Sequence, residues 1–217
     1  MQEQAVHDQT RERLLSSALE IFAEKGFREA TVREICAKAD VNAASVNYYF
    51  RSKEALYVEV LEFSCRQASE RYPDDKARDL SVPVEERLFY FVQNFLQRLL
   101  DDTHLGHHFK LFTREIADPS KALDQVLETS MKPRCSLIHD IIDLVLGTGV
   151  TEMDRHRLGL SIVGQCLVYR HSRSLIDRVC PEVIIDNDEI DRTARLITDF
   201  SLAGLRGMIV ENHQRET

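Results

Sequence analysis

Helical periodicity runs through almost the whole chain and constrains its fold more than any other feature. Apolar residues recur every three or four positions, as at Leu14, Ala18, Ile21 and Phe22, and this is the spacing of one face of an α-helix. Only 8 glycines and 5 prolines interrupt the 217 residues. No segment alternates apolar and polar residues for long enough to predict a sheet. We therefore expect an all-α fold.

The first seventy residues carry start and stop signals for four helices. The first helix is expected to end at Gly26, which is placed as a left-handed cap. Thr31 and Glu34 form a T-x-x-E capping box that opens a short second helix. Asn42 can cap a third helix and Ser52 a longer fourth one. Three short helices and a long one form a compact layout that is typical of DNA-binding domains.

The rest of the chain is also expected to be helical, after a charged, turn-rich stretch at 74–83. Pro133 should kink or split one of these helices, because proline has no N–H to donate. The expected bounds are 84–101, 106–117, 120–146, 154–179 and 188–210.

Composition excludes several classes of protein. Hydrophobic residues make up 43% of the chain and charged residues 29%, which is too apolar for a disordered protein. The net charge of -8 argues against non-specific polyanion binding by the whole surface, although it permits a local DNA-binding face. The chain opens polar, and no run approaches the roughly 18 apolar residues of a membrane span. We expect a cytoplasmic protein.

The cysteines are odd in number and include no C-x-x-C pair. Most lie among apolar neighbours at helical spacing, so we interpret them as reduced core thiols, with a redox or metal role as the alternative. They are Cys36, Cys65, Cys135, Cys166 and Cys180.

The stretch from Ala30 to Leu56 combines two helices, a tight turn, the aromatic run Tyr48-Tyr49-Phe50 and the capped start Ser52-Lys53-Glu54. With the preceding helix, it resembles the DNA-binding region of the TetR/AcrR-type transcriptional regulators. The chain departs from the family pattern at Asp40, where glycine is usual. Aspartate tolerates the left-handed conformation of such a turn better than most residues.

The resemblance implies two domains. Residues 1–53 would form a three-helix DNA-binding domain with a helix-turn-helix, and residues 54–217 a helical body for effector binding and dimerisation. Within the body, 109–119 and 161–173 are similar to the CerR/CecR-like sub-group of the family. The ligands of that sub-group do not carry over by resemblance.

The resemblance also implies that the third helix enters the major groove. Ala43, Ala44, Ser45 and Asn47 would then face the bases: asparagine can bond adenine bidentately, serine can bond several base edges, and alanine can pack on thymine methyl groups. Arg33, on the second helix, matches a position that reaches a base in some relatives.

Four further residues would contact phosphate: Thr31, Tyr48, Tyr49 and Lys53. Each class of contact has an ordinary alternative. Tyr49 could belong to the core only, Lys53 could be an ordinary exposed lysine, and Asn47 could be a solvated helix residue.

Three polar residues on otherwise apolar helix faces are candidate anchors of an effector pocket. These are Arg114, Gln165 and Tyr169. The alternative, which we favour, is that they form interhelical hydrogen bonds or interface contacts.

The last two helices are the expected dimer interface, because TetR-type bodies dimerise through them. Small residues there permit close helix approach, or else only pack within one subunit: Gly159, Gly164, Ala203, Gly204 and Gly207. Leu160, Ile197, Leu202 and Leu205 would supply apolar surface.

Three histidines permit a metal hypothesis. His104 has one-turn spacing to His107 or His108, and Glu115 could supply an oxygen ligand. Adjacent histidines point in different directions, however, and no second cluster has ligand spacing. We favour surface or loop histidines and expect no metal and no cofactor.

These observations favour a one-component regulator that binds an operator as a homodimer, more often as a repressor than as an activator, and responds to a small molecule. One alternative is a metal-dependent hydrolase that uses the region of His104, His107 and His108, although the chain has no H-E-x-x-H, G-x-G-x-x-G or G-x-S-x-G motif. The other is an interaction module that has lost DNA binding.

Overall fold

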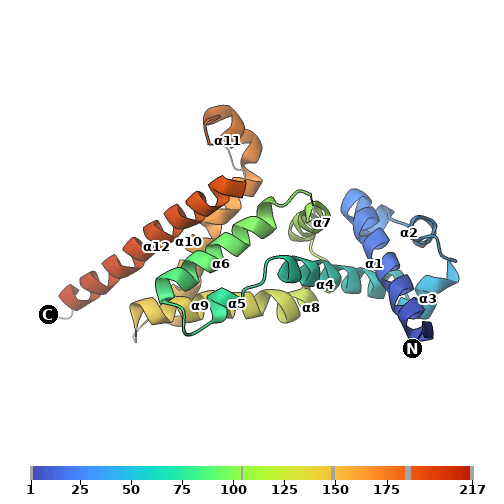
Figure 1. The fold of residues 1–217 in the computed structure, drawn as a ribbon, viewed down its shortest axis with the longest axis horizontal. Coiled ribbons are helices and arrows are strands. Elements are labelled where there is room, and N and C mark those ends of the chain that lie inside the picture. The colour runs from blue at the N-terminus through green and yellow to red at the C-terminus, as the bar shows by residue number, and fades with distance from the viewer. Residues whose placement is uncertain (1, 104, 148–149, 184–186, 216–217) are drawn as a thin grey trace. The chain divides into compact units, whose positions relative to one another are not determined.

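The computed structural model describes residues 2–103, 105–147, 150–183 and 187–215, without the side chains of 2–6, 187–188 and 209–215. Every regular element in these ranges is a helix, which confirms the all-α prediction. The chain forms two compact units (Figure 1). Unit 1 comprises Met1–Arg71 and Asp101–Lys132, and unit 2 comprises Tyr72–Leu100 and Pro133–Thr217. The division into a DNA-binding domain at 1–53 and an effector-binding and dimerisation domain at 54–217 stays a prediction.

Unit 1 joins the four N-terminal helices to a later segment of the chain. In it, α1 packs against α2, α4 and α7, and α4 packs against α8. Gly26 has a φ of 77° and breaks the regular helix before α1 ends. The elements are α1 (Gln2–Glu29), α2 (Val32–Ala39), α3 (Ala44–Phe50), α4 (Lys53–Arg71), α7 (Gly106–Ala117), α8 (Lys121–Val126) and the π-helical turn η1 (Leu127–Met131).

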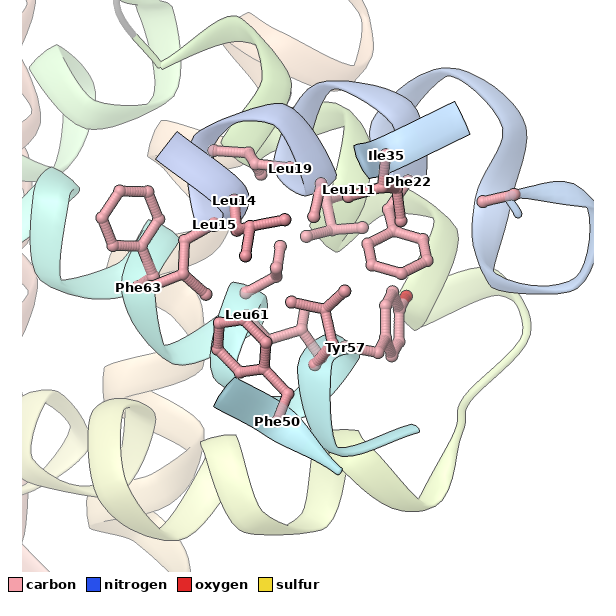
Figure 2. Close-up of a cluster of buried hydrophobic side chains, with 14 of the residues drawn as sticks. Leu14, Leu15, Leu19, Phe22, Ile35, Phe50, Tyr57, Leu61, Phe63 and Leu111 are labelled. Carbon is pink, nitrogen blue, oxygen red and sulfur yellow. The ribbon is translucent and has the colours of Figure 1, made fainter. Parts of the chain in front are cut away.

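One apolar cluster forms the core of unit 1, and Figure 2 shows its central side chains. Phe22 of α1, Ile35 of α2 and Leu61 of α4 are fully buried in it. Leu111 of α7 and Val126 of α8 are equally buried in the same cluster. The core under the first three helices is therefore completed by residues far along the chain.

Unit 2 is built around α6 and α12, which pack along each other, and α10 contacts both (Figure 1). Its elements are α5 (Asp75–Arg78), α6 (Val84–Leu100), α9 (Lys132–Leu146), α10 (Glu152–His171), α11 (Arg173–Val179) and α12 (Asn187–Arg215).

One helix prediction is met and one needs correction. The interruption expected at Pro133 is the π-turn η1 directly before it, where Lys132 donates its N–H to the carbonyl of Leu127, five residues back. A proline cannot supply the usual donor in the next turn, so the register widens here. The expected helix at 154–179 ends at His171, and α11 follows after Ser172.

The cysteine prediction is right for three of the five residues. Cys36, Cys65 and Cys166 are buried, whereas Cys135 is exposed and Cys180 is half-buried. Burial raises the pKa of the Cys166 thiol to about 12. Cys135 is exposed because it lies in the first turn of α9, before the buried residues of that helix, which begin at Leu137. No helix among the described residues is long and apolar enough to cross a bilayer.

Removing the α7 contribution to the core should destabilise the first three helices. We expect Leu111→Ala to lower the free energy of unfolding by about 2–5 kcal/mol, because it opens a cavity in a fully packed site. Ile116→Ala, at a 63% exposed position of the same helix, should change it by less than about 0.5 kcal/mol. Urea denaturation of both variants measures this. Equal effects would contradict a core that includes α7.

Candidate nucleic-acid interface

The start of α2 is held by the capping box that the sequence predicts. The Thr31 hydroxyl accepts the Glu34 N–H at 3.2 Å, and the Glu34 carboxylate accepts the Thr31 N–H at 3.1 Å. Lys25 donates to the same carboxylate at 2.6 Å. The hydrogen bond from Lys25, followed by those from Thr31, lowers the pKa of Glu34. The corner between α1 and α2 is therefore fixed by paired charges and backbone bonds.

The turn between α2 and α3 centres on Asp40. This residue has φ 53° and ψ 54°, the left-handed conformation, and its N–H donates to the Ala37 carbonyl at 3.3 Å. Arg13 of α1 donates to the carbonyl oxygens of Ala39 and Asp40. The departure from the family pattern thus keeps the backbone geometry that glycine would provide.

The third helix, α3, has one buried and one exposed face. Asn42 accepts the Ala44 N–H at 2.9 Å, so it caps the helix start as predicted. Val46 and Phe50 are buried and anchor the helix in the core. Ser45 is half-buried, and four candidates are exposed: Ala43, Ala44, Asn47 and Tyr48.

The candidate phosphate contacts lie on unit 1 with different exposures. Thr31 is exposed, as is the base-contact candidate Arg33. Tyr48 is 73% exposed, and its ring meets that of Tyr49 edge-on with centroids 4.9 Å apart. Tyr49 is half-buried. Lys53 is also half-buried, so it is not an ordinary exposed lysine.

Two contacts at this surface were missed by the sequence analysis. His7 lies against Tyr49, with ring centroids 4.6 Å apart, although it precedes the recognisable motif. Lys53 lies over the ring of Phe27, with Nζ 4.6 Å from the ring centroid, and donates to the Arg28 carbonyl at 3.4 Å. No local sequence pattern indicates either contact, because the partners are far apart along the chain.

The effector candidates occupy different units. Arg114, in unit 1, donates to the carbonyl oxygens of Ala23 at 3.1 Å and Glu24 at 2.8 Å. In unit 2, Gln165 of α10 donates to the Ser201 hydroxyl of α12 at 3.2 Å. Burial is the main cause that raises the pKa of the half-buried Tyr169, and the neighbouring Cys166 is the second. Arg114 and Gln165 thus make hydrogen bonds between helices, and an effector role for the three stays a prediction.

The interface candidates divide by exposure. Gly159 is buried against Ile138 and His139 of α9. Leu160 is 71% exposed. The other small residues on α10 and α12 are exposed: Gly164, Ala203, Gly204 and Gly207.

The apolar surface of α12 differs from the expected one. Ile197, Leu202 and Leu205 are buried within unit 2, which corrects their assignment to the subunit surface. Leu196 and Phe200 are exposed instead, at 65% and 70%. The helix turns Ile197, Leu202 and Leu205 inward because α6 covers that face.

The described residues do not support a metal site at the histidines. His104 lies outside the described residues, and Nδ1 of His108 is 3.0 Å from the Ser64 hydroxyl. Glu115 is buried and accepts hydrogen bonds from Tyr57 and Ser120. In the described part of the chain, no group of three His, Cys, Asp or Glu residues is arranged to hold a metal ion.

Comparison with known families is decisive for the class of protein. Residues 84–205 match the C-terminal domain of the HTH-type transcriptional dual regulator CecR, and residues 14–60 match the bacterial regulatory proteins of the tetR family. The chain belongs to the TetR family and has a CecR-like C-terminal domain. Both resemblances found in the sequence are confirmed. Members of this family are DNA-binding transcription regulators rather than enzymes, which sets the hydrolase alternative aside.

Individual relatives agree with this assignment. The chain is 25% identical over 210 residues to the HTH-type transcriptional dual regulator CecR of Shigella flexneri, covering 91% of this chain and 93% of that one. It is 25% identical over 213 residues to the HTH-type transcriptional repressor NicS of Pseudomonas putida, covering 92% and 93%. A TetR-like transcriptional regulator from a Rhodococcus species shares the fold, with a TM-score of 0.64 and 20% identity over 91% of this chain and 96% of that one.

The turn of this TetR-family protein gives a direct test of its backbone. Asp40→Gly should keep or slightly raise the free energy of unfolding, because glycine adopts the left-handed conformation without strain. Asp40→Val should lower it by about 1–2 kcal/mol, since its side chain clashes in that conformation. Urea denaturation compares the two variants. A valine tolerated as well as glycine would rule out a left-handed residue at this turn.

Proposed function

We propose that this protein is a ligand-responsive repressor that binds a pseudo-palindromic operator as a homodimer and is released by a small-molecule effector. The observation that carries this proposal is the exposed face of α3, held in position by α1 and by the left-handed turn at Asp40. The relatives support the sign of regulation in part, because NicS is described as a repressor and CecR as a dual regulator.

In this proposal, Asn47 and Ser45 read base edges, while Ala43 and Ala44 pack on thymine methyl groups. Arg33 of α2 reaches a base at the edge of the groove. Phosphate contacts come from four residues around α3: Thr31, Tyr48, Tyr49 and Lys53. The exposure of Asn47 and Tyr48 supports these roles, since both side chains are available to a duplex.

Base-reading and phosphate-binding residues should respond differently to mutation. Lys53→Ala should weaken binding to all DNA sequences similarly and lower the salt slope by about one per subunit. Asn47→Ala should change base preference, at about 1–3 kcal/mol for each bidentate pair lost. Fluorescence anisotropy over a salt series measures both effects. Lys110→Ala, an exposed lysine of α7, is the matched control and should leave affinity unchanged. Unchanged affinity and preference in Asn47→Ala would remove this residue from the base-reading set.

The homodimer is supported by the outer faces of α10 and α12. Leu160, Gly164 and Val168 follow one another at four-residue spacing on α10, and Leu160 and Val168 are 71% and 44% exposed. On α12, Leu196 and Phe200 have the same spacing, and the small residues Ala203, Gly204 and Gly207 follow. Large exposed apolar residues beside small ones permit close helix approach. Two such helices from each subunit would form an isologous four-helix bundle.

Effector response requires that a change in the body alters the position of α3. In unit 1, two adjacent residues of α7 hold the helices that carry the DNA-binding motif. Arg114 bonds the last turns of α1, and Glu115 accepts from Tyr57 of α4 at 2.6 Å. Any displacement of α7 would therefore act on α1 and α4 together. A differential affinity of about 1–3 kcal/mol between two such states is enough for a regulatory response.

Charge placed on the α12 face should separate the subunits. We expect Phe200→Glu and Gly204→Glu to sediment as monomers and to lose specific operator binding, because the charges would be buried unpaired in the interface. The unmodified protein should sediment as a species of about 50 kDa, twice the chain mass of 25.0 kDa. Leu80→Glu, at an 81% exposed position outside this face, is the control and should remain dimeric. A 25.0 kDa species that binds the operator tightly would contradict the dimer.

A further inference from the structure

Unit 1 contains a cavity of about 490 Å³ beside the corner between α1 and α2. Residues 25–29 form one wall, Tyr57 of α4 forms a second, and the end of α7 with the turn after it forms a third. Small-molecule pockets have volumes of about 300–1,000 Å³, so this cavity is large enough for a ligand. Of the effector candidates, Arg114 lines it.

Two aromatic rings contribute to the cavity wall. The centroids of Phe27 and Tyr57 lie 4.9 Å apart, and Phe22 supports Tyr57 from the core at 4.8 Å. The face of an aromatic ring has a negative electrostatic potential and attracts cations. Phe27 already shows this property, because the ammonium group of Lys53 lies 4.6 Å from its centroid.

The most buried charged group of the wall is Glu115, which is only 3% exposed. Its carboxylate accepts hydrogen bonds from the Tyr57 hydroxyl at 2.6 Å, the Ser120 hydroxyl at 3.0 Å and the Ser120 N–H at 3.2 Å. A carboxylate has about four acceptor positions, so one remains. Among the described residues, no lysine, arginine or histidine forms an ion pair with Glu115.

The basic residues of the wall already have other acceptors. Lys25 donates to Glu34 at 2.6 Å, and Arg28 pairs at 3.4 Å with Asp118, which also lines the cavity. Arg114 bonds two carbonyl oxygens of α1. The cavity therefore combines a buried carboxylate without a cationic partner, two aromatic rings and cations that are occupied by other acceptors. This combination favours a positively charged ligand over an anion.

We propose that this cavity binds a small organic cation, with its charged group on Glu115 and its apolar part against Phe27 and Tyr57. The ligand would contact the residues that precede Thr31, and it would share Phe27 with Lys53. Its effect on operator binding rests on the proposed function, because Thr31 and Lys53 are proposed phosphate contacts. The binding itself does not depend on that function.

Isothermal titration calorimetry of the full-length protein tests the proposal. The probes are tetramethylammonium, choline and benzyltrimethylammonium, with 3,3-dimethyl-1-butanol as the uncharged isostere of choline and benzoate as an anion. We expect saturable binding of at least one cation, and binding of the alcohol and of benzoate at least about tenfold weaker. The proposal is overturned if no cation binds, or if the alcohol or benzoate binds as tightly.

Variants locate the site. Glu115→Gln should weaken cation binding at least about tenfold, because it removes a buried charged partner. The amide oxygen can still accept from Tyr57, and a thermal melt checks that the variant is folded. Glu128→Gln, an exposed carboxylate of η1, carries the same charge change and should bind as the unmodified protein does. Unchanged affinity in folded Glu115→Gln would overturn the site.

If Glu115→Gln does not fold, Phe27→Leu decides the question. It should weaken binding by about twofold to thirtyfold through loss of the ring face, and unchanged affinity would overturn the proposal. Operator binding without added cation is measured in parallel. A protein that binds its operator but no cation contradicts only the cavity site, whereas one that binds a cation but no operator contradicts only the proposed function.

Discussion

The buried hydrogen bond from Tyr57 to Glu115 joins α4 to α7, and the organisation of unit 1 depends on it. A carboxylate in an apolar interior is costly unless donors surround it. Tyr57 and Ser120 provide those donors. Burial is the main cause that raises the pKa of the Tyr57 hydroxyl, and the hydrogen bond to Glu115 is the second. Tyr57 therefore remains a neutral donor near neutral pH. Two helices whose bonded residues lie 58 positions apart in the sequence are thereby fixed relative to each other.

The short helix α3 also depends on its surroundings. With seven residues, α3 is too short to be stable by itself in water. It persists because Val46 and Phe50 are buried in the core, Asn42 caps its start, and Arg13 bonds the preceding turn. That core includes Leu111 of α7. The position of the exposed face of α3 is thus a property of the whole of unit 1 rather than of the first three helices.

Local signals in the sequence predicted most of the helices and the motif. The capping box at Thr31, the left-handed residue Asp40 and the cap at Asn42 each act within four residues of the chain, and all three are present in the structure. The bounds of α6 and α7 also follow from periodicity and turn residues. The end of α10 could not be predicted, because apolar spacing continues through Ser172 into α11.

Long-range packing could not be predicted from the sequence. Nothing local shows that Arg114 bonds the end of α1, that Lys53 lies over Phe27, or that Glu115 is buried beneath Tyr57. The prediction of which α12 residues lie on the surface was wrong for a related reason. Ile197 and Phe200 are both apolar, and only the position of α6 determines which of them faces inward.

The central claim is that α7 is an integral part of the unit that carries the DNA-binding motif. Native-state amide hydrogen exchange tests it most directly, because residues of one cooperative unit open together. The core amides of α7, such as Leu111 and Phe112, should share one opening free energy and one urea dependence with the core amides of α1 and α4. Exchange of α7 through an opening of much lower free energy, while α1 and α4 stay protected, would contradict the account.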